Sequence, residues 1–363
     1  MNRGNPAMLE LARELRSLNQ LQLAEQLGLS QGAVSRLENG TLPLSNEIVS
    51  NLSRVLHFPE AFFFQECDYR NLPLTFFRKR ARVPASAIRA VRARTCLFRL
   101  HVRILLKSAD VPVLRVPLID SRERRGDVEA IANDVRLQWS LPPGPVANLT
   151  RTMEDAGVIV SRCEFGTAQI DALSSCESDG LPPLVFVNPV SPGDRLRFSL
   201  AHELGHIVLH HHLNCPAEAD TEGEADRFAA EFLMPKQDIR GHFARKLTLE
   251  AFAQMKSYWK VSIQALIRRA RSLDRITERY ERTLYMQMSK YGYRKNEPVI
   301  IPAEEPTLFR ELIQFHLTEL EYSRADLARA LHIEPSDLRA LHTDKVAELR
   351  SVKPQVTEIR NLG

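Results

Sequence analysis

The stretch RFSLAHELGHIVLHHH, residues 197–212, constrains this chain more than any other part of its sequence. His202 and His206 are four residues apart, and on an α-helix this spacing places both imidazoles on one face, one turn apart. Two nitrogens at that separation can reach one Zn²⁺ ion. Glu203 follows the first histidine and is expected beside the ion, where a general base for a bound water belongs. The sequence therefore predicts a buried, metal-binding helix.

A catalytic zinc site needs a third protein ligand and one open position. The following segment, TEGEADRFAAEFLMP, carries several carboxylates. At about 100° per residue, Glu222 falls at the edge of the apolar helix face, whereas Glu224 and Glu231 fall on the opposite side. A carboxylate on the core side needs a partner, so Glu222 is the predicted third ligand. Asp226, one turn further on, is expected to accept a hydrogen bond from a ligating imidazole.

The N-terminal region carries a different pattern, LAEQLGLSQGAVSRLENG. Gly28 permits a tight turn between two short helices, and Ser30 is a plausible N-cap for the second one. Leu29, Val34 and Leu37 are expected to bury that second helix. The residues left facing outward suit base edges and phosphates, and they are Gln31, Gly32, Ser35 and Arg36.

On these residues, the segment from Met8 to Phe64 closely resembles the Xre/Cro-like family of helix-turn-helix repressors. The resemblance implies that Gln22 contacts phosphate and that Gln31, Ser35 and Arg36 face the major groove of a double-stranded DNA operator. Members of the family usually dimerise, which implies a homodimer on a palindromic site. The alternative is a helical protein-interaction domain that has lost DNA binding.

The combination of FSLAHELGHIVLH with EGEADRFAAEFLMP resembles the ImmA/IrrE family of zinc metallopeptidases, over residues 145–270. By this resemblance His202 and His206 are zinc ligands, Glu203 is the catalytic base, and Glu222 is the third ligand, four residues before Asp226. Mn²⁺ is the alternative ion. The family fold implied is a small α+β peptidase of zincin type, in which VFVNP forms an edge strand that holds substrate by β-augmentation.

The group that stabilises the oxyanion stays open at this point. Tyr258 and the triple histidine of residues 210–212 are the candidates, and the sequence does not select among them. For the triple histidine, a solvated helix end is the simpler interpretation.

The stretch between these two regions is strongly basic. Residues 70–125 hold fifteen Lys and Arg against three Asp and Glu. Arg89, Arg92, Arg99 and Arg103 recur at helical spacing and could bind single-stranded DNA or an acidic partner. The alternative is a solvated helix face whose aliphatic stems pack on a neighbour.

Composition favours a cytoplasmic protein without a membrane partner. The chain has no run of 18 apolar residues and no secretory signal at its start. Its five cysteines lack CxxC spacing, which fits a reducing compartment, and each is expected to be a small core or surface residue.

A chain of 363 residues is expected to form several domains. We expect a multidomain, mainly α protein with an N-terminal all-α helix-turn-helix domain (1–68), a basic helical connector (69–125), a central α+β zincin-like peptidase domain (126–292) and a C-terminal helical domain (300–363). The stretch NEPVIIPAEEPT reads as a linker. Beyond it, SRADLARALHIEPSDLRALH repeats the apolar pattern of the N-terminal motif, so a second helix-turn-helix-like unit is an option.

These features lead to one hypothesis and two rivals. The leading hypothesis is a DNA-binding transcriptional regulator whose zinc-dependent endopeptidase domain cleaves a helix-turn-helix repressor or the chain itself. In the first rival, the peptidase-like domain senses a metabolite without cutting. In the second, single-stranded DNA at residues 70–125 acts as the signal that switches on the peptidase.

Overall fold

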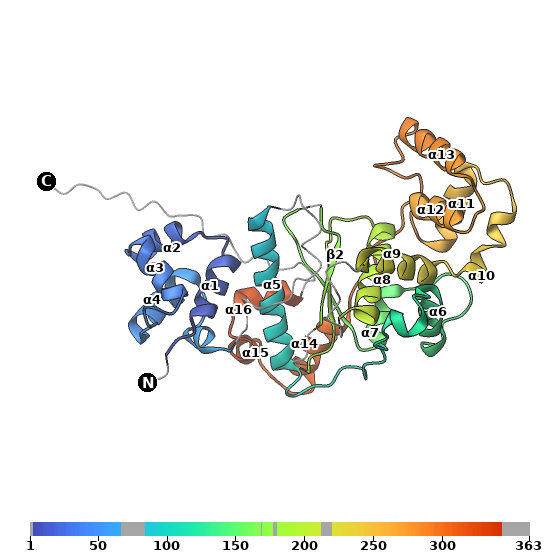
Figure 1. Ribbon diagram of the computed structural model, residues 1–363. Coiled ribbons are helices and arrows are strands. Elements are labelled where there is room, and N and C mark those ends of the chain that lie inside the picture. The colour runs from blue at the N-terminus through green and yellow to red at the C-terminus, as the bar shows by residue number, and fades with distance from the viewer. Residues whose placement is uncertain (1–2, 67–83, 168, 177–179, 212–219, 343–363) are drawn as a thin grey trace. The chain divides into compact units, whose positions relative to one another are not determined.

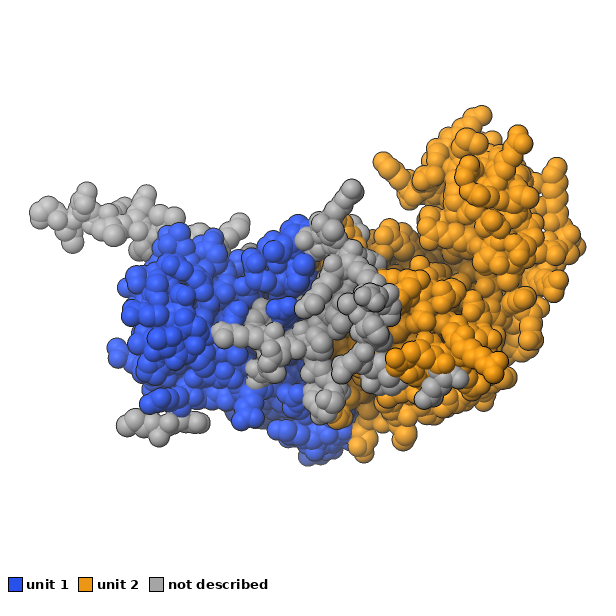
Figure 2. Space-filling model, viewed as in Figure 1, with its two compact units in different colours: residues 1–109, 313–363 blue, residues 110–312 orange. Residues whose placement is uncertain are grey.

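The computed structural model describes residues 3–66, 84–167, 169–176, 180–211 and 220–342. The chain folds into two compact units, 1–109 with 313–363, and 110–312, which Figure 2 colours blue and orange. Helices dominate both units and the second holds one small sheet, so the expected mainly α, multidomain architecture is confirmed (Figure 1). The domain boundaries expected from the sequence stay predictions. None of the described helices is both long and apolar enough to cross a membrane.

The first unit begins with a bundle of short helices. They are α1 (Pro6–Leu15), α2 (Gln20–Leu27), α3 (Gln31–Glu38), α4 (Asn46–Leu56) and the 3-10 helix η1 (Glu60–Phe64). The turn between α2 and α3 follows the sequence closely. Gly28 adopts a left-handed conformation with φ 68°, and the Ser30 side chain caps α3 by accepting a hydrogen bond from the Ala33 amide. Val34 and Leu37 are buried, but Leu29 is 41% exposed and does not bury α3 as expected.

The helix α5 (Ala85–Leu105) packs on α1 inside the first unit. The residues that join it to the N-terminal core are Ala93, Cys96, Leu97 and Leu100. Arg99 is only 4% exposed, and Arg89 lies 3.4 Å from the Glu14 carboxylate. The expected arginine stripe is therefore partly used inside the fold, and residues 70–83 of the basic stretch lie outside the described part of the chain. Cys96, expected as a simple core cysteine, is disulfide-bonded.

The C-terminal part of the first unit follows α14 (Leu308–Thr318), inside which the unit boundary falls. The helices α15 (Arg324–Ala330) and α16 (Pro335–His342) then pack on each other. Asp337 of α16 lies 3.5 Å from Arg16, whose guanidinium also donates to the Leu56 carbonyl at 2.7 Å. Asp337 is therefore engaged by the N-terminal bundle.

The helices of the second unit include α8 and α9, which carry the expected metal ligands. In chain order, the helices are η3 (Ser121–Arg124), α6 (Val128–Gln138), α7 (Leu149–Asp155), α8 (Gly193–Leu209), α9 (Thr221–Leu233), α10 (Lys236–Ile239), η4 (His242–Ala244), α11 (Leu249–Trp259), α12 (Ile263–Ser272) and α13 (Glu278–Lys290). One continuous apolar core runs through this unit. Within it α8 packs on α9, and α9 packs on α6 (Figure 1).

A three-stranded sheet lies against α8. Its strands are β1 (Ile159–Arg162), β2 (Ala172–Ser175) and β3 (Leu184–Val187), in the order β1-β3-β2. β3 pairs parallel with β1 and antiparallel with β2. The expectation that VFVNP forms an edge strand is therefore wrong, because β3 lies in the centre. Among the described residues, the edge strand that packs on α8 is β2.

A glycine brings α8 and α9 close together. A Cβ atom on Gly205 would lie 3.2 Å from both the Ala225 Cα and the Phe228 Cβ. Asp220 caps the start of α9 by accepting a hydrogen bond from the Gly223 amide at 3.1 Å. Glu222 thus belongs to the first turn of α9, and it faces α8 across a short helix–helix distance.

The segment expected as a linker is instead docked on the second unit. The carboxylate of Glu304 pairs with the buried Arg197 of α8 and accepts a hydrogen bond from the Thr150 amide at 2.7 Å. Glu154 accepts the backbone amides of Thr307 and Leu308 at the start of α14, both at 3.0 Å. Buried charge and unsatisfied helix amides together explain why this segment is held down.

Candidate functional site

Three side chains from α8 and α9 converge on one point. The Nε2 atoms of His202 and His206 lie 3.0 Å apart, and the Glu222 carboxylate lies 3.6 Å from the first and 3.5 Å from the second. Among the described residues, His202, His206 and Glu222 form the one group of at least three His, Cys, Asp or Glu side chains that could hold a metal ion. His206 is 1% exposed, whereas Glu222 is about one-third exposed, so the group opens toward solvent on the α9 side.

The second nitrogen of His202 is held by Asp226. Its Nδ1 lies 2.8 Å from Asp226 Oδ1. Because a carboxylate accepts and does not donate, Nδ1 carries a proton, and in the neutral ring the Nε2 lone pair points toward His206 and Glu222. This is the tautomer that a metal ligand needs.

A longer hydrogen-bond chain stands behind His206. Its Nδ1 lies 3.0 Å from His210 Nδ1, and His210 Nε2 lies 2.9 Å from Glu224 Oε2. Glu224 also accepts a hydrogen bond from the Ser121 hydroxyl at 3.1 Å. Glu224 fixes the His210 proton on Nε2, which makes His210 Nδ1 an acceptor for the His206 Nδ1 proton. His210 is buried here and is not a solvated helix end.

Glu203, expected as the base, is buried on α8 beside the edge strand β2. Its Oε2 accepts a hydrogen bond from the Ser174 hydroxyl at 2.6 Å, and the same hydroxyl lies 3.0 Å from His211 Nε2. A short polar chain thus joins α8, the middle of β2 and the residues after α8. Sequence patterns do not mark Ser174, because DALSS lacks the β-branched and aromatic residues that are typical of a strand.

The charges of the three converging groups are strongly coupled. Burial opposes the charged form of His202, but the carboxylates of Asp226 and Glu222 outweigh it and raise its pKa to about 9. Burial lowers the pKa of His206 to about 3. The neighbouring rings of His202 and His206, whose Nε2 atoms lie 3.6 and 3.5 Å from the Glu222 carboxylate, hold the pKa of Glu222 well below its usual range. The site therefore combines one ionised carboxylate and a neutral His206 with a His202 whose extra proton a bound cation would displace.

The remaining oxyanion candidates are placed differently. Tyr258 lies on α11, where its ring stacks on His242 at a centroid distance of 5.2 Å. His211 lies next to Glu203 through Ser174, as described above. His212 lies outside the described residues. Glu231, which the helix wheel put on the opposite side of α9, is buried in an ion pair with Arg269.

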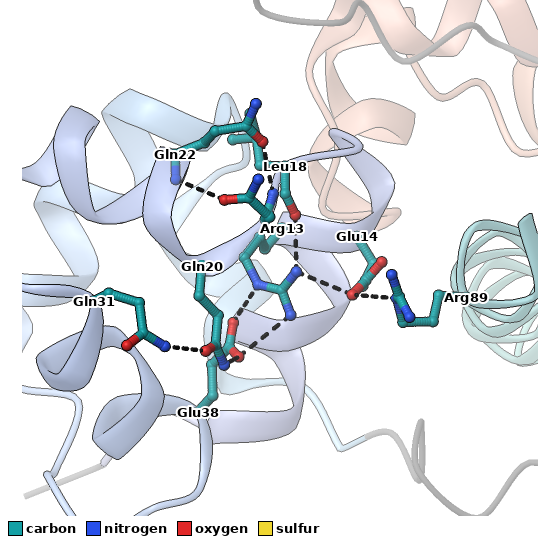
Figure 3. Close-up of polar contacts among 9 residues, drawn as sticks. Arg13, Glu14, Leu18, Gln20, Gln22, Gln31, Glu38 and Arg89 are labelled. Carbon is teal, nitrogen blue, oxygen red and sulfur yellow. Dashed lines mark hydrogen bonds and ion pairs between the residues drawn. The ribbon is translucent and has the colours of Figure 1, made fainter. Parts of the chain in front are cut away.

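The helix-turn-helix region carries a separate polar network, drawn in Figure 3, whose central residues Arg13 and Glu38 are buried. Buried Arg13 donates to the Glu38 carboxylate at 2.5 Å, and Gln20 donates to the same carboxylate at 2.7 Å. The Gln31 amide in turn donates to Gln20 Oε1 at 2.7 Å. This chain fixes the start of α3 relative to the start of α2. Gln20 was not among the residues that the sequence singled out.

The residues expected to contact DNA lie at the start of α2 and along α3. Gln31 and Arg36 are exposed and Ser35 is half-buried. Gln22 is exposed as well, and its side chain accepts the Asn19 amide at 2.8 Å in a capping box at the start of α2 (Figure 3). In helix-turn-helix proteins the second helix of such a pair lies in the major groove and the first crosses the backbone.

The fold and the two sites define a DNA-binding regulator that carries a metallopeptidase-like domain. Residues 9–63 match the family model described as helix-turn-helix, and residues 153–271 match the peptidase family described as IrrE N-terminal-like domain. A search of curated proteins found no match. The two matched segments are those in which the sequence resembles an Xre-like helix-turn-helix domain and an IrrE/ImmA-like domain, so both resemblances are confirmed for these segments.

Proposed function

We propose that this chain is a cytoplasmic transcriptional regulator that binds a double-stranded DNA operator and hydrolyses a peptide bond in a regulatory protein. The observation that carries the proposal is the convergence of His202, His206 and Glu222 beside Glu203, in the same chain as a helix-turn-helix domain. The hydrolytic half is a zinc-dependent endopeptidase, for which Mn²⁺ is an alternative ion.

The donor set fits zinc. Three donors at about 2.1 Å from one tetrahedral ion stand about 3.4 Å from one another. The corresponding distances here are 3.0, 3.5 and 3.6 Å. Two imidazoles and one carboxylate leave a fourth position for water or substrate. When bound, the ion would lower the pKa of its water and polarise the scissile carbonyl.

The chain's own residues then perform the proton transfers. Glu203 takes a proton from the attacking water and delivers it to the leaving amine nitrogen. Asp226 and the His210–Glu224 pair keep the two histidines in the tautomer that exposes Nε2. An extended substrate can add to the edge of β2, which takes over the role that the sequence assigned to VFVNP.

The DNA-binding half uses α3 as the groove-facing helix. Gln31, Ser35 and Arg36 read base edges, while Gln22 contacts a phosphate. Gln20 adds a second amide at the start of α2 and holds Gln31 in place. We propose a homodimer on a two-fold symmetric operator, because two copies of such a unit match two half-sites. A role for residues 70–125 with single-stranded DNA stays a prediction.

The proposed substrate is a helix-turn-helix repressor or the chain itself. The test incubates the purified full chain with Zn²⁺ or Mn²⁺ and with repressors encoded beside its own gene. Mass spectrometry then looks for new fragments of each protein. Metal-dependent fragments with one defined cleavage site support the proposal. A loaded protein that leaves every repressor and itself intact contradicts it and favours the non-cleaving sensor.

A further inference from the structure

We propose that Ser174 is a positioning residue for Glu203, and that His211 holds Ser174 in the orientation this requires. The inference rests on the proposed peptidase function and deepens it. It assigns to the edge strand β2 a second task, the orientation of the catalytic base, besides the seating of a substrate strand.

The direction of the hydrogen bonds follows from the chemistry of the three groups. An ionised Glu203 only accepts, so the Ser174 hydroxyl must donate its single proton to Oε2, 2.6 Å away. The hydroxyl oxygen is then the acceptor for His211 Nε2 at 3.0 Å. His211 must therefore carry a proton on Nε2, which it donates to the hydroxyl oxygen.

The hydrogen bonds among Glu203, Ser174 and His211 are strengthened by burial. Ser174 is 4% exposed and Glu203 is 7% exposed. A carboxylate in such surroundings needs a donor, and the bond to that donor is stronger than it would be in water. The hydroxyl also stops rotation of the carboxylate about its last torsion, which would otherwise be broad. The orientation of the base is thus set by a residue outside α8.

The position of Ser174 in the sheet links this orientation to the substrate. Its side chain contacts Glu203, while its backbone belongs to β2, paired with Val185 of β3. A peptide that adds to the edge of β2 would press on the same strand that holds the base. We infer that Ser174 couples substrate seating to the alignment of Glu203, so its loss should lower kcat more than it raises KM.

A purely structural role for Ser174, as a tether between β2 and α8, predicts a different result. Loss of a tether lowers stability and metal content together, with no preference for kcat. The neighbouring Ser175 offers a matched control, because it lies on the same strand, is equally buried and by strand alternation points to the opposite face.

The experiment compares the full-length, zinc-loaded variants S174A, S174T, H211A, S175A and E203Q with the wild type. It measures kcat and KM on the substrate found by fragment analysis, the zinc content, and the melting temperature. We expect S174A to lower kcat about tenfold to a hundredfold with KM and zinc content unchanged. S174T, which keeps the hydroxyl, should restore most of the activity, and H211A should fall between wild type and S174A.

A spectroscopic readout does not depend on activity. In ¹⁵N-histidine spectra of the zinc-loaded protein, His211 should appear as the Nε2–H tautomer, and S174A should shift its resonances whereas S175A should not. Equal kcat in S174A and S175A, with E203Q inactive, overturns this inference and leaves the peptidase intact. E203Q with wild-type activity overturns the peptidase itself. If S174A does not fold, an unchanged kcat in H211A overturns the inference.

Discussion

His210 Nε2 lies 2.9 Å from Glu224 Oε2, and this pair stands directly behind the candidate metal ligand His206. This pair determines which nitrogen of His206 carries its proton. Glu224 accepts the hydrogen bond from the Nε2–H of neutral His210, so His210 Nδ1 is left as an acceptor for the proton on His206 Nδ1. Metal ligands in proteins depend on such outer partners for their orientation and basicity. We therefore expect Glu224 to influence metal binding at a site that it does not itself contact.

From this relationship we predict that Glu224→Ala weakens metal binding about tenfold to a hundredfold. The variant leaves His202, His206 and Glu222 in place and removes only the outer carboxylate. The measurement is a competition titration of Zn²⁺ against a chromogenic chelator. Asp134→Ala, which removes a half-exposed carboxylate from α6, serves as the control. Equal affinity in the two variants would show that the chain behind His206 has no role in metal binding.

A second prediction concerns the segment docked on α8. A Cβ atom at Gly193 would run into the carbonyl oxygens of Ile301 and Pro302, which are backbone atoms. Gly193→Ala should cost the second unit about 1–3 kcal/mol, which is several °C in melting temperature. Tryptophan fluorescence reports this unit, since Trp139 and Trp259 both lie in it.

The matched control for that substitution is Gly241→Ala. Nothing lies within 4 Å of a Cβ at Gly241, and its φ of −62° suits any residue. A melting temperature that falls equally in both variants would mean that Gly193 is not needed for the docking of residues 301–302.

The third prediction is a pH dependence of the first unit. Burial, with a smaller contribution from His332, lowers the pKa of His101 on α5 from 6.5 to about 3. The unfolded chain therefore binds more protons between these two values. The stability that neutral His101 provides is fully present above about pH 6.5 and is lost as the pH falls toward 3.

Hydrogen exchange of peptides from α5 is the appropriate measurement, because it isolates the first unit. Between pH 7 and pH 5, corrected for intrinsic exchange, protection should fall more steeply in the wild type than in His101→Leu. His57→Gln, at an exposed position, should behave as the wild type does. The same slope in all three proteins would exclude His101 as the source of acid sensitivity.

The fourth prediction concerns DNA. Arg36 and Gln31 lie exposed on α3, so Arg36→Ala and Gln31→Ala should each lower affinity for a selected operator about tenfold to a hundredfold. Arg54→Ala removes an equally exposed charge from α4 and should have a small effect. Fluorescence anisotropy on duplexes chosen from a random library measures this. An operator that binds Arg36→Ala as tightly as Arg54→Ala would speak against α3 as the reading helix.

Local patterns in the sequence predicted the local parts of the structure well. The periodicity around Gly28 and Ser30 marks the ends of α2 and α3, because caps and turns depend on neighbouring residues alone. The four-residue spacing of His202 and His206 likewise fixes their shared face. The roles of the site residues themselves remain predictions.

Contacts between distant segments could not be predicted from the sequence. VFVNP contributes to the central strand β3 because β1 pairs with one edge of it and β2 pairs with the other. No sequence pattern marks β2, which is short and rich in serine. Glu224 seemed to face solvent on an isolated helix, whereas His210 reaches it from the end of α8. The supposed linker docks because Glu304 meets the buried Arg197. Each of these depends on a partner far away in the chain.

The central claim is that the centre formed by His202, His206 and Glu222 hydrolyses peptide bonds with Glu203 as base. The most direct test compares wild type with Glu203→Gln on the same substrate at equal, measured zinc content. We predict one zinc per chain in both proteins and a loss of cleavage of about a hundredfold or more in the variant. Cleavage at the wild-type rate by the zinc-loaded variant would contradict the claim.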